Sequence, residues 1–170
     1  MSMNKQPHPN AAQTRLPPHP LSVDAVLAAR TSVPVLVSGD QETALRVALD
    51  IASRSGGGDA GNVMIVDAAE ATGPGSFMHN APESGGPLTT VILREIQSFT
   101  AAQQAALVEL IAESRRLNFS SAWRVIATTS VPLFDRVVEG SFNARLFYFL
   151  NSIHIVMALR AESLDARPEN

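Results

Sequence analysis

Short runs of consecutive apolar residues alternate along the chain with segments in which apolar residues recur every three or four positions. The runs predict buried β-strands at Val33–Val37, Val63–Val66, Leu88–Leu93, Arg124–Thr128 and Ile153–Val156. The periodic segments predict helices at Val23–Arg30 after a Ser22 N-cap, between Thr43 and Gly56, between Thr100 and Leu117–Asn118, and at Phe142–Leu150. Strands that alternate with helices predict an α/β fold, in which helices cover both faces of a five-stranded parallel sheet.

Two of the predicted helices carry start signals and a defined apolar face. The first has Thr43 as its candidate N-cap, and its expected buried face comprises Leu45, Ala48, Leu49 and Ala52. The second begins with a capping box of Thr100 and Gln103. Its expected stripe comprises Leu107, Leu110, Ile111 and Ser114.

Both ends of the chain and one internal segment lack these patterns. Residues 1–20 contain five of the eleven prolines and almost no large apolar side chains, so we expect a flexible tail. Docking in an aromatic groove is the alternative for such a proline-rich segment. Residues 163–170 are expected to form a second tail, which leaves one domain at 21–162. Asp67–Pro87 is rich in glycine, proline, serine and alanine and predicts a long loop.

Composition narrows the classes of function. A chain of 170 residues with 45% apolar content suits one domain with a substantial core. A net charge of -3 without clustered lysine or arginine argues against direct binding of nucleic acid. No cysteine is present, which excludes disulfides and thiolate metal ligands. No apolar run is long enough for a signal peptide or a membrane span, so we expect a cytoplasmic location without membrane contact.

The candidate chemistry lies in residues 39–46, where the first strand meets the next helix. A phosphate-binding loop at such a junction reads G-x-x-x-x-G-K-[ST]: backbone amides and the lysine hold phosphates, and the hydroxyl holds magnesium. Here Gly39 is present, but the other three motif positions are Ala44, Leu45 and Arg46. In addition, Asp40 and Glu42 place carboxylates near the expected position of a triphosphate.

These substitutions weaken phosphate binding by a large factor. Loss of the lysine removes a charge-assisted hydrogen bond of about 1.5–3 kcal/mol. A carboxylate about 4 Å from a phosphate adds roughly 4 kcal/mol of repulsion at an effective dielectric near 20. Each ~1.4 kcal/mol is tenfold in affinity, so several decades are lost. Arg46 would replace the lysine only if its side chain turned back over the loop, and the alternative is a solvated helix arginine.

From Val33 to Arg160, the order of elements and several motifs resemble the AAA+ ATPase core of sigma-54-dependent transcription activators. Residues 39–46 align without a gap with that family's G-E-x-G-T-G-K-E loop, and residues 85–96 resemble its G-G-T-L-F-L-D-E-I strand. Residues 123–130 are similar to V-R-I-I-A-A-T-N, and residues 138–151 to E-G-x-F-R-x-D-L-Y-Y-R-L-N. The resemblance implies a P-loop NTPase-like (AAA+) three-layer sandwich.

At the positions that this family uses for hydrolysis, the chain departs from the pattern. The resemblance places Arg94 at the magnesium-binding aspartate, Glu95 at the water-activating carboxylate and Ser130 at the sensor asparagine. A carboxylate base without its metal contributes little to phosphoryl transfer. Two interpretations of Arg94 stay open: an ion pair with Glu95, Asp67 or Glu42, or an anion-binding role.

The resemblance also points to a contact surface. The two arginines that the family inserts into a neighbouring subunit fall at Asn143 and Phe149, inside a segment rich in aromatic residues. An aromatic in place of an inserted arginine favours an apolar protein contact, and ordinary core packing is the alternative. The candidate interface residues are Phe142, Asn143, Arg145 and Phe149.

Two larger parts of the family are expected to be absent. About twenty residues separate Val66 from Leu88, too few for the helix and G-A-F-T-G-A loop with which the family engages sigma factor. The chain ends shortly after Arg160, before the family's helical lid and helix-turn-helix. The resemblance therefore implies no contact with sigma factor or promoter by the usual route.

Other catalytic or metal chemistry has no supporting pattern. The four histidines have no spacing that would place two on one helix face, so no metal site is predicted. His154 lies in an apolar strand and is expected to be a hydrogen-bonded core residue. No G-x-S-x-G motif precedes a helix, so an acyl-transfer triad is not supported.

The sequence therefore predicts a degenerate, non-hydrolysing AAA+ domain that acts as a regulatory protein-interaction module in transcription control. No catalytic residue, metal or cofactor is expected, and the substitutions disfavour ATP. The vestigial nucleotide positions are Gly39, Asp40, Glu42, Thr43, Ala44, Leu45, Arg46, Arg94, Glu95 and Ser130. The expected partner is a protein, either a second copy of this chain or an activator ATPase. Two alternatives are a nucleotide or anion sensor that uses Gly39, Arg46 and Arg94, and a weak ATPase completed by a partner subunit.

Overall fold

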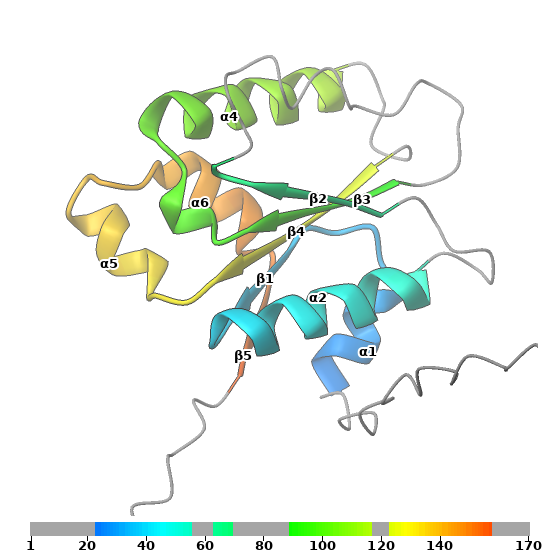
Figure 1. Cartoon of the computed structure of the whole chain (residues 1–170). Coiled ribbons are helices and arrows are strands. Elements are labelled where there is room, and N and C mark those ends of the chain that lie inside the picture. The colour runs from blue at the N-terminus through cyan, green and yellow to red at the C-terminus, as the bar shows by residue number, and fades with distance from the viewer. Residues whose placement is uncertain (1–22, 56–62, 70–88, 117–122, 158–170) are drawn as a thin grey trace, which may run out of the picture.

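The centre of the molecule is a single sheet of five strands, all parallel, in the order β2-β3-β4-β1-β5 (Figure 1). The computed structural model describes residues 23–55, 63–69, 89–116 and 123–157 of the chain. The strands are β1 (Val35–Ser38), β2 (Val63–Asp67), β3 (Thr89–Arg94), β4 (Trp123–Thr129) and β5 (Ile153–Val156). All five predicted strands are present, so the predicted α/β fold with a five-stranded parallel sheet is confirmed.

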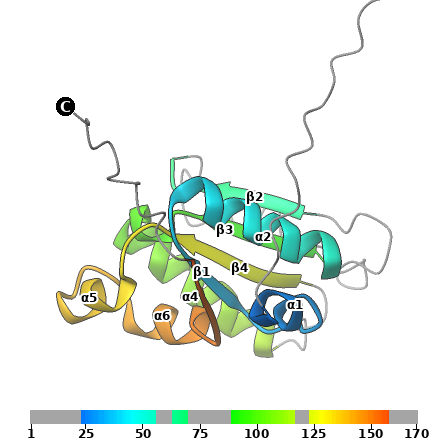
Figure 2. The same cartoon turned by 90° about the horizontal axis from the view of Figure 1, so that it is seen from below.

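Helices cover both faces of the sheet and make a sandwich of three layers (Figures 1 and 2). One face carries α1 (Val23–Ala29) and α2 (Gln41–Ser55). The other carries α4 (Ala101–Arg116), α5 (Leu133–Val138) and α6 (Ala144–Leu150), with the short 3-10 helix η1 (Ile96–Ser98) after β3. Because every strand is parallel, the carboxyl ends of all five meet at one edge.

The two layers of core differ in the size of their side chains. Alternation along β1 sends Val35 and Val37 to the face of α1 and α2, and Leu36 to the opposite face. The first face packs mainly small residues, which allow α2 to lie close to the sheet; its alanines are Ala25, Ala28, Ala44, Ala48 and Ala52. The second face is filled by larger residues, among them Phe99, Leu107, Ile111, Phe142, Leu146 and Phe147.

The start and the buried face of α2 differ from the sequence prediction. The helix begins at Gln41, before the expected N-cap Thr43. Its buried residues are Ala44, Val47, Ala48, Ile51 and Ala52, whereas Leu49 is 39% exposed. Both stripes fit a helical period and differ by one position. The alanine stripe permits the closer approach to the sheet, so tertiary packing decides between them.

The N-terminus of α4 agrees with the sequence prediction. The Thr100 amide donates to Gln103 Oε1 at 2.7 Å, and the Gln103 amide donates to Thr100 Oγ1 at 3.3 Å, which confirms the capping box. Leu107 and Ile111 are buried on the expected stripe. The short elements η1 and α5 were not predicted, because segments of one or two turns leave too few apolar positions for a period.

Several predictions fall on residues that are not described. The tails at 1–20 and 163–170, the glycines at 56–58 and most of the loop at 67–87 lie outside the described ranges. Within those ranges, no helix has the length and apolar character needed to cross a lipid bilayer.

Candidate functional site at the carboxyl edge of the sheet

The junction between β1 and α2 is far shorter than a phosphate-binding loop requires. Only Gly39 and Asp40 separate Ser38, the last residue of β1, from Gln41, the first of α2. The Ala44 amide already donates to the Asp40 carbonyl at 2.8 Å, as in an α-helix. Residues 41–46 of the predicted motif therefore lie inside α2, and the amides from Ala44 onward make helix hydrogen bonds instead of facing a ligand.

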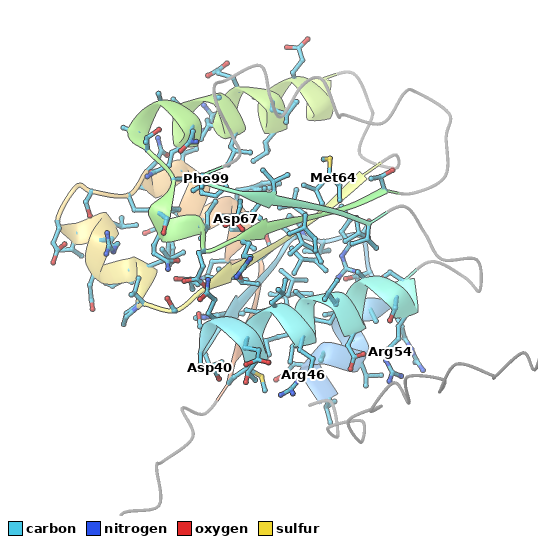
Figure 3. The ribbon with its side chains drawn as sticks, in the orientation of Figure 1. Asp40, Arg46, Arg54, Met64, Asp67 and Phe99 are labelled. Atoms are coloured by element: carbon cyan, nitrogen blue, oxygen red, sulfur yellow. The ribbon has the colours of Figure 1, made fainter. Side chains whose placement is uncertain are left out.

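Asp40 is the N-cap of α2, and the sequence prediction of Thr43 in that role is wrong. The Thr43 amide donates to Asp40 Oδ1 at 3.0 Å. Hydrogen bonds with Thr43, and to a smaller extent the charge of Arg46, hold the pKa of Asp40 below its ordinary value of 3.8. Figure 3 shows Asp40 at the start of α2, with Arg46 further along the helix. The partial positive charge of this helix end is therefore already matched by the chain's own carboxylate.

Gly39 has a packing role in the structure. Its amide donates to the Thr129 carbonyl at 3.0 Å, and the Met157 amide donates to the Ser38 carbonyl at 2.7 Å. A Cβ atom on Gly39 would lie 2.8 Å from Cβ of Met157, closer than real Cβ contacts. The absence of a side chain at Gly39 thus admits the segment that follows β5.

The positions of the remaining motif residues do not favour phosphate binding. Ala44 is buried and Leu45 is half-buried against the core layer of α1 and α2. Glu42 and Arg46 are exposed on α2. The exposure of Arg46 fits the solvated helix arginine among the two interpretations of this residue.

Arg94 forms an ion pair at the ends of β2 and β3. Its Nη1 lies 3.0 Å from Oδ2 of Asp67, its direct neighbour in the strand register. Of the three acidic partners that the sequence offers for Arg94, Asp67 is therefore the one that forms the ion pair. Both side chains are about one-third exposed, at 34% and 32%, so the pair adds only about 0–1 kcal/mol of stability.

Glu95 is held in a strained backbone conformation by a hydrogen-bond network. Its φ of 49° and ψ of 56° lie in the left-handed region, which residues with a side chain seldom occupy. Its amide donates to Thr128 Oγ1 at 3.1 Å. Its Oε2 accepts from the Ser130 hydroxyl at 2.6 Å and from Gln97 Nε2 at 2.6 Å. Gln97 Nε2 also lies 2.9 Å from Ser130 Oγ, which closes the network.

The structure thus brings together Glu95 and Ser130, two of the vestigial nucleotide positions named from the sequence. It also adds Gln97 and Thr128, which sequence reasoning missed. Their signal in the sequence was only that polar residues follow or end a buried strand. The Glu95 side chain is 9% exposed, and its Oε1 has no partner within the described residues.

His154 is hydrogen-bonded as predicted, but the prediction that it lies in the core is wrong. It is exposed on the edge strand β5, and its Nε2 lies 2.7 Å from Ser38 Oγ. Partial burial lowers the pKa of its imidazole below the ordinary value. Among the described residues, no cluster of three His, Asp or Glu side chains could hold a metal ion.

The four predicted interface residues occupy different environments. Phe142 is 3% exposed and packs in the core, so a direct contact with a partner is contradicted at this position. Asn143 caps α6: its Oδ1 accepts from the Leu146 amide at 3.0 Å. Arg145 is exposed, and Phe149 is half-buried in the wall of a groove between α4 and α6.

Solved structures with a similar chain path identify the class of fold. NtrX from Brucella abortus in complex with ATP matches with a TM-score of 0.57 and 18% identity, over 78% of this chain and 35% of that chain. The P-loop NTPase domain of a sigma-54 transport activator from E. coli matches with a TM-score of 0.53 and 18% identity, over 73% of this chain and 95% of that chain. A point variant of RuvB from Thermotoga maritima matches with a TM-score of 0.54 and 17% identity, over 78% of this chain and 42% of that chain. The fold is that of a P-loop NTPase of the AAA+ class.

The family follows from the sequence itself. Residues 27–158 match the sigma-54 interaction domain, and the chain belongs to this family. Among curated proteins, none matches the sequence significantly. The chain spans about one-third of the length of NtrX, with 35% of that chain covered.

Proposed function

We propose that this sigma-54 interaction domain neither binds nor hydrolyses ATP and that it acts through protein contacts in the control of transcription. One observation carries the first part: α2 begins at Gln41, and the Asp40 carboxylate occupies its N-terminal end. A triphosphate would have to displace an anion that is attached to the chain, without a lysine to compensate for the lost interaction.

The rest of the edge supports the same proposal. Arg94 stands where the family's magnesium-binding aspartate is expected, and its charge is matched by Asp67. Glu95 could act on a water molecule only after it exchanged its bonds to Ser130 and Gln97. These pairings also argue against the anion sensor, since its two expected cations are an arginine in an ion pair and an exposed helix arginine.

The second part of the proposal rests on exposed apolar side chains on α5 and α6. Phe134 is 55% exposed, Val138 73% and Tyr148 67%. The rings of Phe134 and Tyr148 both lie against Phe147, with centroids 6.0 Å and 5.4 Å away. Exposed aromatic side chains grouped in this way are typical of protein interfaces.

Calorimetry with ATP and magnesium tests the first part directly. We expect no heat of binding at millimolar nucleotide, and no turnover above that of a Glu95→Gln control. Magnesium-dependent turnover well above this control would overturn the proposal.

A second variant tests whether ATP binding is prevented by the missing motif side chains or by the short loop between β1 and α2. The triple substitution Ala44→Gly, Leu45→Lys and Arg46→Thr restores the motif letters but leaves Asp40 in place. We expect it to remain without ATP binding, because residues 41–46 are helical. Binding by this variant would show that side chains alone were lacking.

A further inference from the structure

A serine and a histidine lie together at the carboxyl end of β1 and β5. Nε2 of His154 is 2.7 Å from Oγ of Ser38, although the two residues are 116 positions apart in the chain. His154 is exposed and Ser38 is half-buried, so a reagent in solution can reach the pair. A hydroxyl within hydrogen-bond distance of an imidazole is the arrangement that activates serine as a nucleophile.

Two neighbouring parallel strands hold this pair in position. In the strand register, Val156 of β5 lies directly opposite Ser38, and His154 precedes Val156 by two residues. Alternate residues of a strand share a face, so the three side chains lie on one face of the sheet. The backbone of Ser38 is also held, because its carbonyl accepts from the Met157 amide at 2.7 Å. Val156 is 71% exposed and adds an apolar surface beside the hydroxyl.

The surroundings of His154 favour the form of the ring that accepts a proton. Partial burial lowers the pKa of its imidazole below 6.5, so the ring is neutral at pH 7. Over the described part of the chain, no carboxylate bonds His154, so the pair has no third member. In a Ser-His-Asp triad, disabling the aspartate lowers kcat by about 10⁴. The pair therefore suits acyl groups with a good leaving group, such as aryl esters and thioesters, and not amides.

We propose that Ser38 is a nucleophile, with His154 as its general base, and that uncharged activated esters acylate it. Oγ of Ser38 bonds to the acyl carbon while its proton passes to Nε2 of His154. The bond from the acyl carbon to the leaving group breaks, and the leaving group departs with the electron pair as a phenolate or thiolate. The imidazolium then releases its proton to solvent, and the product is an ester of Ser38.

The charge near the pair restricts the acyl donor. Asp40 is an exposed carboxylate only two residues after Ser38, and it disfavours anionic donors such as acyl phosphates. This chemistry goes beyond the proposed function, because it needs neither a nucleotide nor a protein partner.

Incubation of the full chain with p-nitrophenyl acetate at about pH 7 tests the proposal. We expect one acetyl group on Ser38 by mass-spectrometric peptide mapping, with an initial release of p-nitrophenol equal to the amount of protein. Ser38→Ala should abolish both, and His154→Asn should slow the acetylation about 100-fold or more, because the general base is lost. The matched control is Ser53→Ala, which removes an exposed serine hydroxyl from α2 and should change neither result.

The position of the acetyl group decides the outcome in the wild-type chain alone. Acetylation of His154 itself, or of Ser38 no faster than of Ser53, would overturn the inference. An undiminished rate at Ser38 in a folded His154→Asn variant would remove His154 from its role as base. Equal labelling of Ser38 by acetyl phosphate would contradict the preference for uncharged donors. Circular dichroism verifies that each variant is folded.

Discussion

Replacement of Arg124 by methionine should leave the protein nearly as stable as the wild type, although this arginine is among the largest fully buried side chains. It lies on β4 and is 1% exposed. Its guanidinium donates to the Ala28 carbonyl of α1 and to the hydroxyl of Ser55 at the end of α2. No carboxylate pairs with it within the described residues, and burial lowers its pKa.

The magnitudes follow from these contacts. Two hydrogen bonds from a charged donor stabilise by about 1.5–3 kcal/mol each. Desolvation of the cation opposes them by several kcal/mol, and its Nε has no partner in the described structure. Methionine removes both effects, and the acceptors keep other donors or partners: Thr31 bonds the Ala28 carbonyl, and the Ser55 hydroxyl donates to the Ile51 carbonyl. We therefore expect a change within about 1–2 kcal/mol.

Lysine at position 124 is the informative comparison. It keeps the buried charge, but a single ammonium group cannot reproduce the fork that reaches both helices, so about 1.5–3 kcal/mol of hydrogen bonding is lost. In urea unfolding, the Arg124→Lys midpoint should then lie below that of Arg124→Met, by up to about 1 M at typical slopes. A loss above ~4 kcal/mol for Arg124→Met, with Arg124→Lys near wild type, would refute the reasoning, since that is the signature of a broken buried ion pair.

Four further predictions concern single substitutions elsewhere in the chain. Because burial lowers the pKa of His154 below 6.5, the unfolded chain binds its proton more tightly, and unfolding free energy should fall as pH drops below 6.5; His154→Asn should flatten this dependence in urea titrations. The pKa of Asp40 is also lowered, so Asp40→Ala should reduce the melting temperature at pH 7, by a margin that shrinks as pH falls below 3.8. Gly39→Ala should destabilise by about 1–3 kcal/mol through overpacking against Met157. Gly140→Ala, where φ is +75° but no atom lies within 4 Å, should cost roughly 1 kcal/mol from backbone strain alone in the same unfolding assay.

Strand positions were predictable because each strand of this sheet is a compact apolar run. Buried strands in a parallel sheet are apolar on both faces, so β1 and β3 stand out without any knowledge of their neighbours. The buried face of α2 was not predictable in the same way. Two stripes, offset by one residue, satisfy the helical period, and only the approach of α2 to the sheet favours the alanines over Leu49.

The sequence indicates which segment carries the candidate site, but it does not reveal the local geometry of that segment. Residue types at 39–46 indicate that a lysine and a glycine are missing, yet they do not reveal that the helix begins at Gln41. Thr43 was the predicted N-cap, but aspartate is an equally favourable cap type, and Asp40 caps the helix. The left-handed conformation of Glu95 had no local signal, because it depends on Thr128 and Ser130 from the neighbouring strand.

Several charged groups along this edge are paired within the chain, although Arg94 Nε, Glu95 Oε1 and Gln97 Oε1 have no partner among the described residues. A phosphate site offers free amides and an unpaired cation to its ligand, and both depend on a preorganised, unsatisfied edge. Here Asp40 caps the N-terminus of α2, Asp67 forms an ion pair with Arg94, and Ser130 donates a hydrogen bond to Glu95. Large apolar side chains remain exposed on the helices α1, α5 and α6. Burial of such surface drives protein association, and we therefore place the proposed contacts on these helices instead of at the carboxyl edge of the sheet.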